Sequence, residues 1–491
     1  MKKRREKKKA SMKFRLLTRF IWLLSLVLTV FFGYELNKLN MLPFKYYFIV
    51  MAFMFLLMFI FGVVVWRKKV GKISLTLITI LMLIYIAVFG FGSLKIKDTV
   101  SFMEKNLGIK FETNVYYVLV NKDSNYKKIK DIKGETVYSF KDQKDMSEVE
   151  SALNKKVKVD IEYETSIYDL LNNLTTDKEL IAYVNSGNYD VMVQNNEDYS
   201  KKVKVLETIE IKTKKEVKKT GIDVTEDPFV ILINGIDTRS GYLPSRSLSD
   251  VNMLMVVNPK EHKILLVSIP RDYYLDIPGT GSKDKLTHTG TIGGVEKTIE
   301  TIENAFGVKI SYYVRVNFNF VTGLVDSVGG IDIYNDQPYS FTCWTDGGCT
   351  FYPEWNYGIG GRCALAFARE RYAYESGDRH RGENQQHVID QIFNKVTSSK
   401  TLISSYSDIL NSLNGTFETN LSNEEITSLV KLQINEMPNW TIEKYSVTGS
   451  GTSAYTYSYP NQALYVMIPD ENTINEAKTK INAILGTESD E

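Results

Sequence analysis

The fold of most of this 491-residue chain is decided by Phe229-Val230-Ile231-Leu232-Ile233-Asn234-Gly235, an apolar run that ends at a turn residue. A short run of this composition predicts a buried strand, and the loop that follows such a strand is a common place for functional residues. The pattern recurs at Val251–Val257 and at Lys263–Ile269, and a turn-forming segment with Pro259 separates these two runs. We therefore expect neighbouring strands of one sheet.

Helical periodicity follows these strands along the chain. Apolar residues recur at helical spacing in Val295–Phe306, Phe320–Val328 and Gln386–Val396. The chain then continues to an apolar strand at Ala463–Ile468 and a helix at Glu471–Leu485. Strands interleaved with helices predict an α/β domain whose mixed central sheet has helices on both faces.

A smaller α/β unit is predicted ahead of this sheet, in about residues 97–224. Val115–Val120 and Tyr189–Val193 are typical of short buried strands, whereas Met146–Leu153 and Ile167–Leu174 have helical spacing. The charged stretch Ile211–Lys219 has no helical stripe and indicates a solvated connector. The unit has no glycine-rich phosphate loop and no paired acid and histidine, so we assign it a structural or recognition role.

The N-terminal part of the chain is apolar enough to anchor it in a membrane. The basic start Met1–Lys9 and the basic connection Arg67–Lys72 predict cytoplasmic segments, and an odd number of crossings then places everything after Lys95 outside. A cleaved signal peptide is the alternative for the first apolar stretch, but no small-residue cleavage site follows it. The three stretches, each near the ~20 residues that cross a bilayer core, are Phe14–Tyr34, Tyr46–Trp66 and Leu75–Leu94.

Length and charge limit the organisation and the partners. With 491 residues and 44% hydrophobic content, the chain exceeds one typical domain. We expect a cytoplasmic N-terminus with three transmembrane helices in residues 1–95, an extracellular accessory domain in 96–224 and a catalytic domain in 225–491. The 60 basic and 58 acidic residues leave a net charge of +2, without the strongly basic face that nucleic-acid binding needs. Nucleic acid is therefore not an expected partner.

The only cysteines, Cys343, Cys349 and Cys363, lie close together in the part predicted to be outside. An oxidising exterior allows a disulfide between Cys343 and Cys349, with Cys363 left over. A zinc site needs four ligands at suitable spacing, and the four histidines of the chain do not supply them. Metal binding by cysteine is therefore not expected.

Arginines gather in the loops that follow the predicted strands. In an extended segment Arg369 and Arg371 point to the same side, and the guanidinium fork matches phosphate oxygens. Together with Arg271 and Arg381 they can neutralise a pyrophosphate. Taken alone, the sequence Arg369-Glu370-Arg371 is equally consistent with a surface ion-pair pattern.

Two aspartates, Asp237 and Asp250, would be repelled by such an anion unless a divalent cation lies between them. Mg²⁺ takes one or two carboxylates and completes its coordination with water and phosphate oxygens. A cation with arginines is the general arrangement for phosphoryl transfer, which needs no histidine nucleophile. His288 and His380 lie near these loops, but lone histidines are more often surface or supporting residues. Asp237 alone also fits a turn.

Short motifs between about residues 228 and 400 carry a resemblance to a known family. They are Gly235-Ile236-Asp237-Thr238-Arg239, Ser249-Asp250-Val251-Asn252, Ile269-Pro270-Arg271-Asp272, Asp284-Lys285-Leu286-Thr287-His288, Val325-Asp326-Ser327-Val328-Gly329-Gly330-Ile331-Asp332, Ala364-Leu365-Ala366-Phe367-Ala368-Arg369-Glu370-Arg371, Gly377-Asp378-Arg379 and Asn384-Gln385-Gln386. In these motifs, their order and the three-span topology, the chain resembles the LytR-CpsA-Psr family, and its capsular-polysaccharide branch in particular. It departs from the family at Leu248, where arginine is usual, so that Arg246 or Arg239 would have to substitute. The segment Phe341–Cys363 is also not part of the family's core pattern.

The resemblance implies a phosphotransferase that moves a glycopolymer, a capsular polysaccharide or a teichoic-acid-like polymer, from undecaprenyl pyrophosphate to peptidoglycan. Asp237 and Asp250 would hold Mg²⁺ or Mn²⁺, and apolar side chains between sheet and helices would form a tunnel for the lipid tail. Membrane lipid and capsule synthesis proteins are further expected partners. The resemblance assigns the pyrophosphate and its head-group site to Arg271, Lys285, Arg369, Arg371, Asp378, Arg381 and Gln385.

Two other functions compete with this one. A lipid pyrophosphatase would use the same site, with water in place of the acceptor. A non-catalytic regulator of capsule chain length usually has a second span near its C-terminus and long coiled coils, whereas Asn472–Leu485 predicts one short amphipathic helix. A role in transcription does not suit a domain placed outside.

Overall fold

The computed structural model describes residues 10–68, 70–103, 109–140, 146–216, 220–238, 242–398, 409, 412 and 415–487. The basic start Met1–Lys9 and Arg239 lie outside these residues. The chain forms two compact units, Met1–Gly108 with Ser422–Pro438 and Ile109–Leu421 with Asn439–Glu491. The predicted boundaries at residues 95 and 224 stay predictions.

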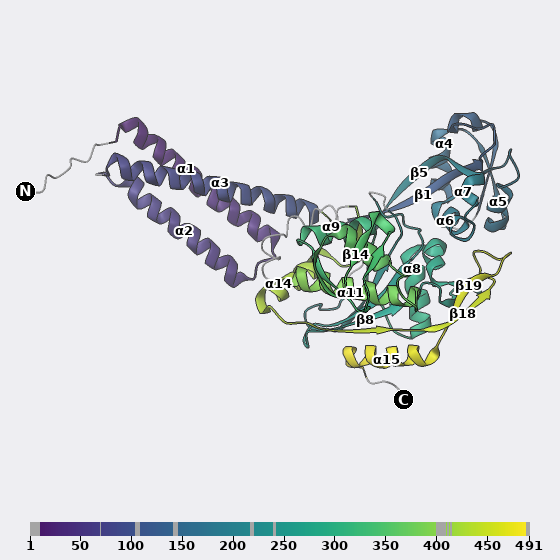
Figure 1. Cartoon of the computed structure of the whole chain (residues 1–491). Helices are drawn as coiled ribbons and strands as arrows, with labels where there is room; N and C mark the ends of the chain where they lie inside the picture. The colour runs from purple at the N-terminus through teal and green to yellow at the C-terminus, as the bar shows by residue number, and fades with distance from the viewer. Residues whose placement is uncertain are drawn as a thin grey trace, which may run out of the picture. The chain divides into compact units, whose positions relative to one another are not determined.

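The first unit contains three long apolar helices and α14 (Asn423–Glu436). The three are α1 (Met12–Leu39), α2 (Phe44–Trp66) and α3 (Lys72–Met103), drawn in purple and blue in Figure 1. By length and composition each can cross a membrane, which agrees with the predicted anchor. Thr18 Oγ1 lies 3.1 Å from Thr79 Oγ1, and Thr29 Oγ1 lies 2.6 Å from Tyr85 OH. Such bonds between helices add to the packing that associates apolar helices.

The second unit begins with a five-stranded sheet in the order β3-β2-β4-β1-β5. Its two longest strands, β1 and β5, pair antiparallel along their whole length. The predicted helices near Met146 and Ile167 and the predicted strand at Val115 are present. The elements are β1 (Ile109–Asn121), β2 (Thr136–Phe140), α4 (Met146–Lys156), β3 (Asp160–Glu164), α5 (Ile167–Asn173), β4 (Ile181–Asn185), α6 (Ser186–Asn195), α7 (Tyr199–Lys202) and β5 (Val203–Glu216).

Two predictions in this sheet are wrong. Tyr189–Val193 belongs to helix α6, because Asn185 accepts a hydrogen bond from Gly187 N and starts a helix directly after β4. Ile211–Glu216 belongs to β5 and is no solvated connector, because β1 pairs with it and Ile211 is buried in the sheet's core. Residues 217–219 of that prediction lie outside the described residues.

The central sheet has six strands in the order β16-β11-β6-β7-β8-β17. β6 pairs parallel with β11 and antiparallel with β7, and β8 pairs parallel with β17, so the predicted mixed sheet is confirmed. The strands predicted from Phe229, Val251 and Lys263 are three neighbouring strands of this sheet, β6, β7 and β8. The bounds are β6 (Phe229–Gly235), β7 (Val251–Asn258), β8 (Lys263–Ile269), β11 (Tyr312–Val316), β16 (Phe417–Thr419) and β17 (Thr441–Ser446).

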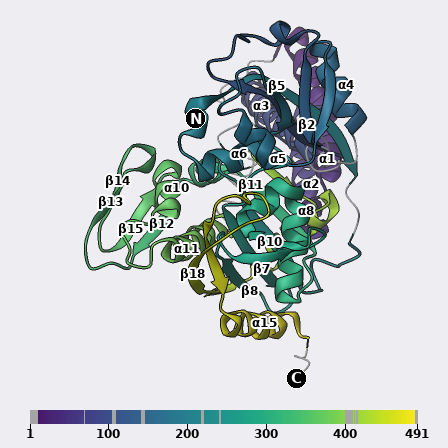
Figure 2. The same ribbon diagram turned by 90° about the vertical axis from the view of Figure 1, so that its right-hand side faces the viewer.

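The two faces of this sheet have different partners. Alternate residues of a strand point to opposite faces, so Val230 and Leu232 of β6 enter the main hydrophobic core, whereas Ile231 and Ile233 line a cavity on the other face. Figure 2 shows the sheet between α11 and α8. The core face is covered by α8 (Leu286–Phe306) and α15 (Glu471–Leu485), and the cavity face by α9 (Phe318–Ser327), α10 (Gly361–Arg369) and α11 (Asp378–Thr397).

The remaining strands form two-stranded sheets around this core. β12 (Ile331–Asn335) pairs with β15 (Glu354–Ile359), and β13 (Phe341–Cys343) pairs with β14 (Cys349–Phe351). β9 (Tyr274–Ile277) pairs with β10 (Ser282–Lys285), and β18 (Gly449–Ala454) with β19 (Leu464–Pro469).

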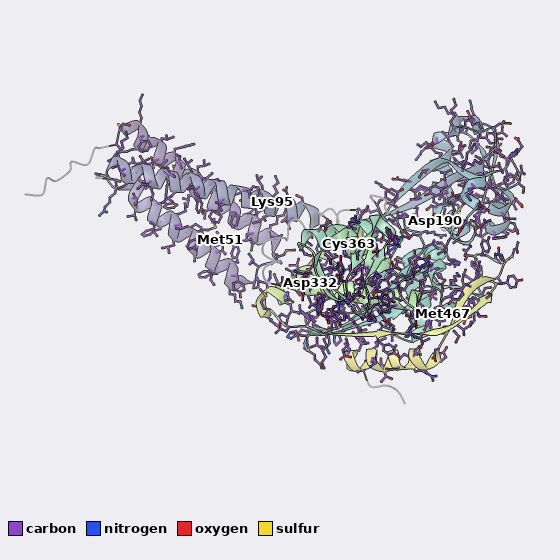
Figure 3. The ribbon with its side chains drawn as sticks, in the orientation of Figure 1. Met51, Lys95, Asp190, Asp332, Cys363 and Met467 are labelled. Atoms are coloured by element: carbon purple, nitrogen blue, oxygen red, sulfur yellow. A yellow bond between two sulfur atoms is a disulfide. The ribbon has the colours of Figure 1, made fainter. Side chains whose placement is uncertain are left out.

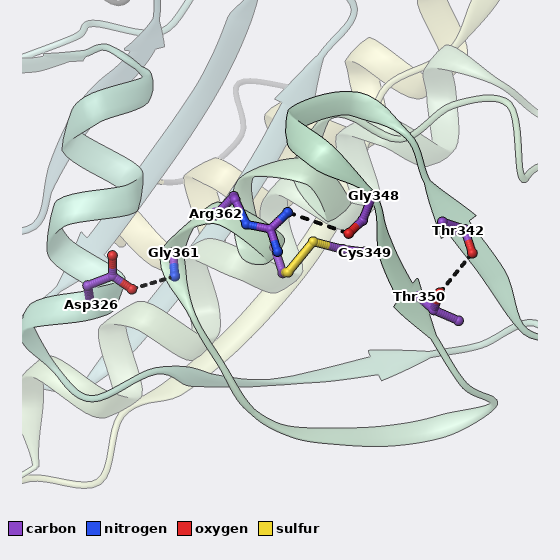
Figure 4. Close-up of a disulfide and its surroundings, with 8 residues drawn as sticks. Asp326, Thr342, Gly348, Cys349, Thr350, Gly361 and Arg362 are labelled. Atoms are coloured by element: carbon purple, nitrogen blue, oxygen red, sulfur yellow. Dashed lines mark hydrogen bonds between the residues drawn. A yellow bond between two sulfur atoms is a disulfide. The ribbon is translucent and has the colours of Figure 1, made fainter.

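The disulfide joins Cys349 to Cys363, with a Cα–Cα distance of 5.6 Å (Figure 4). The predicted Cys343–Cys349 bridge is therefore wrong, although these two residues are opposite each other in the β13–β14 pair. Helix α10 carries Cys363 to β14, and Cys343 remains a buried free thiol. Burial and the carboxylate of Glu370 raise the pKa of Cys343, which keeps this thiol protonated and unreactive.

Removal of the disulfide between β14 and α10 should destabilise the protein. Cys349 and Cys363 are 14 residues apart, and a loop of this size corresponds to about 3 kcal/mol of stabilisation. We expect Cys363→Ser to lower the melting temperature measured by thermal unfolding. Reductant should lower the melting temperature of the wild type to that of the variant and leave the variant unchanged. A wild type insensitive to reductant would contradict this.

Candidate active site

Asp237 and Asp250 lie at the same edge of the central sheet, where β6 ends and β7 begins. Asp250 N donates a hydrogen bond to Gly235 O at 2.9 Å, and Asp237 follows two residues after Gly235. A Cβ on Gly235 would lie 2.8 Å from Val251 Cβ, so only glycine allows this close pairing. The antiparallel register of the two strands thus brings both carboxylates to one edge.

Arg271, which follows β8, extends this edge by a partly buried ion pair with Asp250. Its Nη1 donates to Asp250 Oδ1 at 2.7 Å, and its Nε lies 3.8 Å from Asp272 Oδ2. Burial disfavours the guanidinium charge, but the two carboxylates outweigh it and raise the pKa of Arg271. Nε is buried and has no hydrogen-bond partner among the residues that the structure describes. The guanidinium of Arg271 is held between the carboxylates of Asp250 and Asp272.

Further predicted cations lie beside Arg271. Lys285 Nζ is 3.1 Å from Asp272 Oδ1, and Arg381 Nη2 is 2.9 Å from Asp378 Oδ1. Burial lowers the pKa of Arg381; Asp378 opposes this shift, and the nearby charge of Arg271 adds to it. Positive groups that repel each other in a partly buried site are stabilised when an anion binds between them.

Arg369 and Arg371 do not lie in an extended segment, so their predicted strand geometry is wrong. The Ala-Leu-Ala-Phe-Ala sequence before them consists mostly of good helix formers, and Arg369 is the last residue of α10. Its guanidinium lies 4.3 Å from the centre of the Phe318 ring, and its Nη2 lies 3.7 Å from Asp237 Oδ2. Arg371, in the loop beyond, lines a cleft with Arg271. The two arginines reach the site from a helix end and a loop.

The site residues line a row of three neighbouring cavities. A polar cleft of about 390 Å³ includes Arg271, Lys285, Arg371 and Asp378. A small cavity of about 20 Å³ shares Arg271 and Asp378 with this cleft and adds Arg381. It also shares Asp250 and Gln385 with the third cavity, at which Arg369 lies. The structure thus brings together the arginines, Lys285, Asp378 and Gln385 that the sequence singled out.

The third cavity is apolar, with a volume of about 320 Å³. It lies between the cavity face of the central sheet and the three helices α9, α10 and α11. Its polar lining is confined to a few residues, among them Asp250, Arg369 and Gln385. The apolar lining includes Ile231, Ile233 and Met255 from the sheet and Leu324, Leu365, Val388, Ile389 and Ile392 from the helices. An apolar cavity thus adjoins a cluster of arginines.

Comparison with known proteins shows which family the chain belongs to. A sequence model of the LytR_cpsA_psr family matches residues 191–483, more than half of the chain. The chain belongs to this family. It is 34% identical over 238 residues to the polyisoprenyl-teichoic acid–peptidoglycan teichoic acid transferase TagU of Enterococcus faecalis, a match that covers 47% of this chain and 73% of that protein. TagU of Bacillus subtilis is 31% identical over 256 residues, covering 52% and 79%.

Among solved structures, the chain is similar to protein gbs0355 from Streptococcus agalactiae. The sequence identity is 25% and the TM-score 0.48, and the match covers 56% of this chain and 93% of that chain. The LytR-CpsA-Psr match itself begins inside α6 and ends inside α15. It therefore contains every residue that the sequence singled out for the site.

The two histidines near the ionic loops, His288 and His380, each contact neighbouring side chains. His288 is fully buried, with Nδ1 2.7 Å from Asp284 Oδ1 and Nε2 3.3 Å from Gln194 Oε1. Burial raises the pKa of Asp284, but His288 and Ser458 outweigh it and lower the pKa. The ring of His380 stacks on Tyr374 with 3.6 Å between centres. Neither histidine is among the lining residues of the three cavities.

The sequence did not indicate Asp190, which lies on α6 and is labelled in Figure 3. Burial and the carboxylate of Asp237 raise the pKa of Asp190 to about 7. The two acids therefore interact, although one belongs to the five-stranded unit. Asp190 and Gln194 are four residues apart, so helical spacing would have placed them on one face. The interpretation of Tyr189–Val193 as a strand concealed this.

The magnesium ion expected from the sequence would have two carboxylates at the sheet edge, Asp237 and Asp250. Across the described parts of the chain, no group of three His, Cys, Asp or Glu side chains is arranged to hold a metal ion alone. Mg²⁺ needs only one or two carboxylates when substrate phosphates and water complete its shell. Two such carboxylates, Asp237 and Asp250, lie at this edge, so the expected magnesium site stays a prediction.

Arg246 is not among the lining residues of the three cavities. Its Nη1 donates to Thr291 O at 3.4 Å, and its side chain lines another cavity, together with Tyr168 and Tyr457. The other candidate to replace the family's arginine at Leu248, Arg239, lies outside the described residues. Which residue replaces that arginine stays a prediction.

Buried Arg315 on β11 supports the loop that leads to Asp250. Its Nη2 donates to Pro244 O at 2.7 Å and to Ser247 Oγ at 3.1 Å, and its Nη1 pairs with Glu418 Oε2 at 2.7 Å. Arg315 is 2% exposed, so Glu418 offsets a charge that water cannot reach.

Replacement of Glu418 should therefore destabilise the protein strongly. We expect Glu418→Ala to lower the free energy of unfolding by about 3–5 kcal/mol, because it leaves the Arg315 charge buried without its partner. Chemical denaturation of the variant and wild type measures this. Glu443→Ala is the matched control. Glu443 is an exposed residue of β17, so its replacement should change the free energy of unfolding little. Equal stabilities of Glu418→Ala and wild type would contradict the argument.

Proposed function

We propose that this protein is a phosphotransferase that moves a glycopolymer from a polyprenyl pyrophosphate carrier to a hydroxyl group of peptidoglycan. One observation carries the proposal, the row of cavities in which an apolar space adjoins an arginine cluster and then a polar cleft. The names of the TagU relatives describe transferases of polyisoprenyl-linked teichoic acid to peptidoglycan, which supports the same reaction class here.

Each cavity suits one part of such a carrier. The apolar cavity takes the polyprenyl chain, since burial of each methylene group contributes about 0.8 kcal/mol. Arg271, Arg369 and Arg381 bind the diphosphate by charge-assisted hydrogen bonds. The polar cleft has room for the carbohydrate and for the acceptor. The carrier's three chemical parts thus follow the order of the cavities.

In the reaction, the acceptor oxygen forms a bond to the phosphorus that carries the sugar. The bond from this phosphorus to the bridging oxygen breaks, and polyprenyl phosphate leaves. The hydroxyl proton passes to a carboxylate at the sheet edge, and Arg271 with Arg381 stabilises the charge on the leaving phosphate. Mg²⁺ or Mn²⁺ held by Asp237 and Asp250 would supply further positive charge at the phosphoryl oxygens.

We place the second unit outside the cytoplasmic membrane. The basic segments Met1–Lys9 and Arg67–Lys72 favour a cytoplasmic N-terminus, and three crossings then lead outside, where peptidoglycan lies. The polymer is a capsular polysaccharide or a teichoic-acid-like chain on undecaprenyl pyrophosphate, and capsule synthesis proteins are the expected neighbours.

The test is a product analysis with the full-length protein in detergent micelles. A short saccharide on undecaprenyl pyrophosphate is supplied as donor, with and without peptidoglycan. The proposal expects saccharide linked to peptidoglycan through a phosphodiester, together with undecaprenyl phosphate, and only when peptidoglycan is present. Undecaprenyl phosphate formed at the same rate without peptidoglycan would identify a pyrophosphatase. A protein that binds the donor but yields no product would favour the regulator.

A further inference from the structure

Part of the lining of the polar cleft comes from the five-stranded unit. Helix α6 contributes Gln194 and Asn195 to the cleft. Strand β19, which pairs with β18, contributes Tyr465. These side chains are neutral, whereas the other lining residues are charged: Arg271, Asp272, Lys285, Arg371 and Asp378. The cleft therefore combines phosphate-binding groups with neutral hydrogen-bonding groups.

Close packing fixes the position of α6. A Cβ on Gly187 would lie 3.0 Å from Thr291 Cβ on α8, so the two helices approach at a distance that glycine permits. Gln194 Oε1 lies 3.3 Å from Nε2 of buried His288, also on α8. The end of α6 that carries Gln194 and Asn195 is thus held by the same helix that begins next to Lys285.

The neutral groups offer both donors and acceptors. Asn195 Nδ2 donates to Val191 O at 2.9 Å, which orients the amide and leaves Oδ1 as an acceptor. Tyr465 is 53% exposed, so its ring and hydroxyl are accessible. Burial and the carboxylates of Asp272 and Asp378 raise the pKa of Tyr465, so the hydroxyl keeps its proton and can donate. Amide and phenol groups of this kind match the hydroxyl and acetamido groups of a sugar.

We propose that Gln194, Asn195 and Tyr465 bind the sugar ring next to the diphosphate, so that the five-stranded unit takes part in selecting the glycan. This inference rests on the proposed function. Two sources offer the same sugar chemistry, the first sugar of the lipid-linked donor and a sugar of the peptidoglycan acceptor. Both would lie beside the charged residues of the cleft, where the new phosphodiester forms.

The experiment measures binding of two probes to the full-length protein in detergent micelles. One is undecaprenyl diphosphate, and the other carries a single N-acetylglucosamine on the same diphosphate. Asn195→Ala and Tyr465→Phe should each weaken binding of the sugar-bearing probe about tenfold, the effect of one lost hydrogen bond. Both should leave binding of the sugar-free probe unchanged. Asn188→Ala is the matched control, since Asn188 lies on α6 but lines another cavity.

The outcomes separate the two sources and the two proposals. If donor binding is unchanged but the KM for a soluble peptidoglycan fragment rises about tenfold, the sugar belongs to the acceptor, and the inference stands. Equal weakening of both probes, or no effect on donor or acceptor, would overturn it. Failure of the wild type to bind either lipid would instead count against the proposed function.

Discussion

Replacing Arg271 with alanine should lower the rate of glycopolymer transfer by about a thousandfold. A single arginine that stabilises a phosphoryl transition state contributes 10³–10⁵ in rate in comparable reactions, and we take about the lower limit. Arg271 orients Asp250 through the 2.7 Å bond and lines both the small cavity and the polar cleft. The alanine variant loses both the charge and the orientation of the carboxylate.

The measurement is the transfer rate at saturating donor, with the thermal unfolding of the same preparation. Asp250 is 18% exposed and lines the small cavity, so water can solvate it after the substitution, and the fold should survive. Arg271→Lys keeps the charge without the planar fork and should be intermediate. Arg362→Ala removes an exposed arginine that donates to Gly348 O, away from the three cavities, and serves as the control. A normal rate in the Arg271→Ala variant would remove the enzymatic assignment.

Long apolar segments of this chain could be predicted from sequence because burial alone determines them. Phe229–Gly235 and Val251–Val257 form strands, since both faces of the central sheet are covered and most positions favour an apolar residue. The buried polar exceptions Asn234 and Asn252 bond to each other. The three membrane helices follow from the same argument with lipid as the solvent. Short segments were less predictable. Tyr189–Val193 suits a strand by composition, but capping by Asn185 and packing on α8 make it helical.

The identity of the site residues was easier to predict than their geometry. Arg271, Arg369 and Arg381 stand out as ionic residues near strand and helix ends, and the structure brings them to neighbouring cavities. That Arg369 ends a helix depends on how α10 packs, which local spacing does not report. The contribution of α6 was invisible for a different reason. It depends on the docking of the five-stranded unit at Gly187, and no pattern within α6 encodes its neighbour.

Filling the apolar cavity should weaken binding of the lipid-linked donor strongly without harming the fold. Ile389 on α11 is half-buried and lines this cavity. The larger ring in Ile389→Trp would occupy space that the polyprenyl chain needs. Exclusion of one five-carbon unit, at about 0.8 kcal/mol per carbon, costs roughly 3–4 kcal/mol, or a few hundredfold in affinity. Equilibrium binding of undecaprenyl diphosphate by the full-length protein in detergent measures this.

A probe without a chain separates the cavity from the arginine cluster. Inorganic pyrophosphate has the diphosphate and no chain, so its weaker binding should be equal in wild type and Ile389→Trp. Ile389→Leu conserves volume and should bind undecaprenyl diphosphate normally. Because tryptophan fills an existing space, the melting temperature of Ile389→Trp should be unchanged or higher. Equal loss of both probes would mean that the substitution acts on the arginines, and undiminished binding of the long chain would mean that this cavity does not hold the lipid.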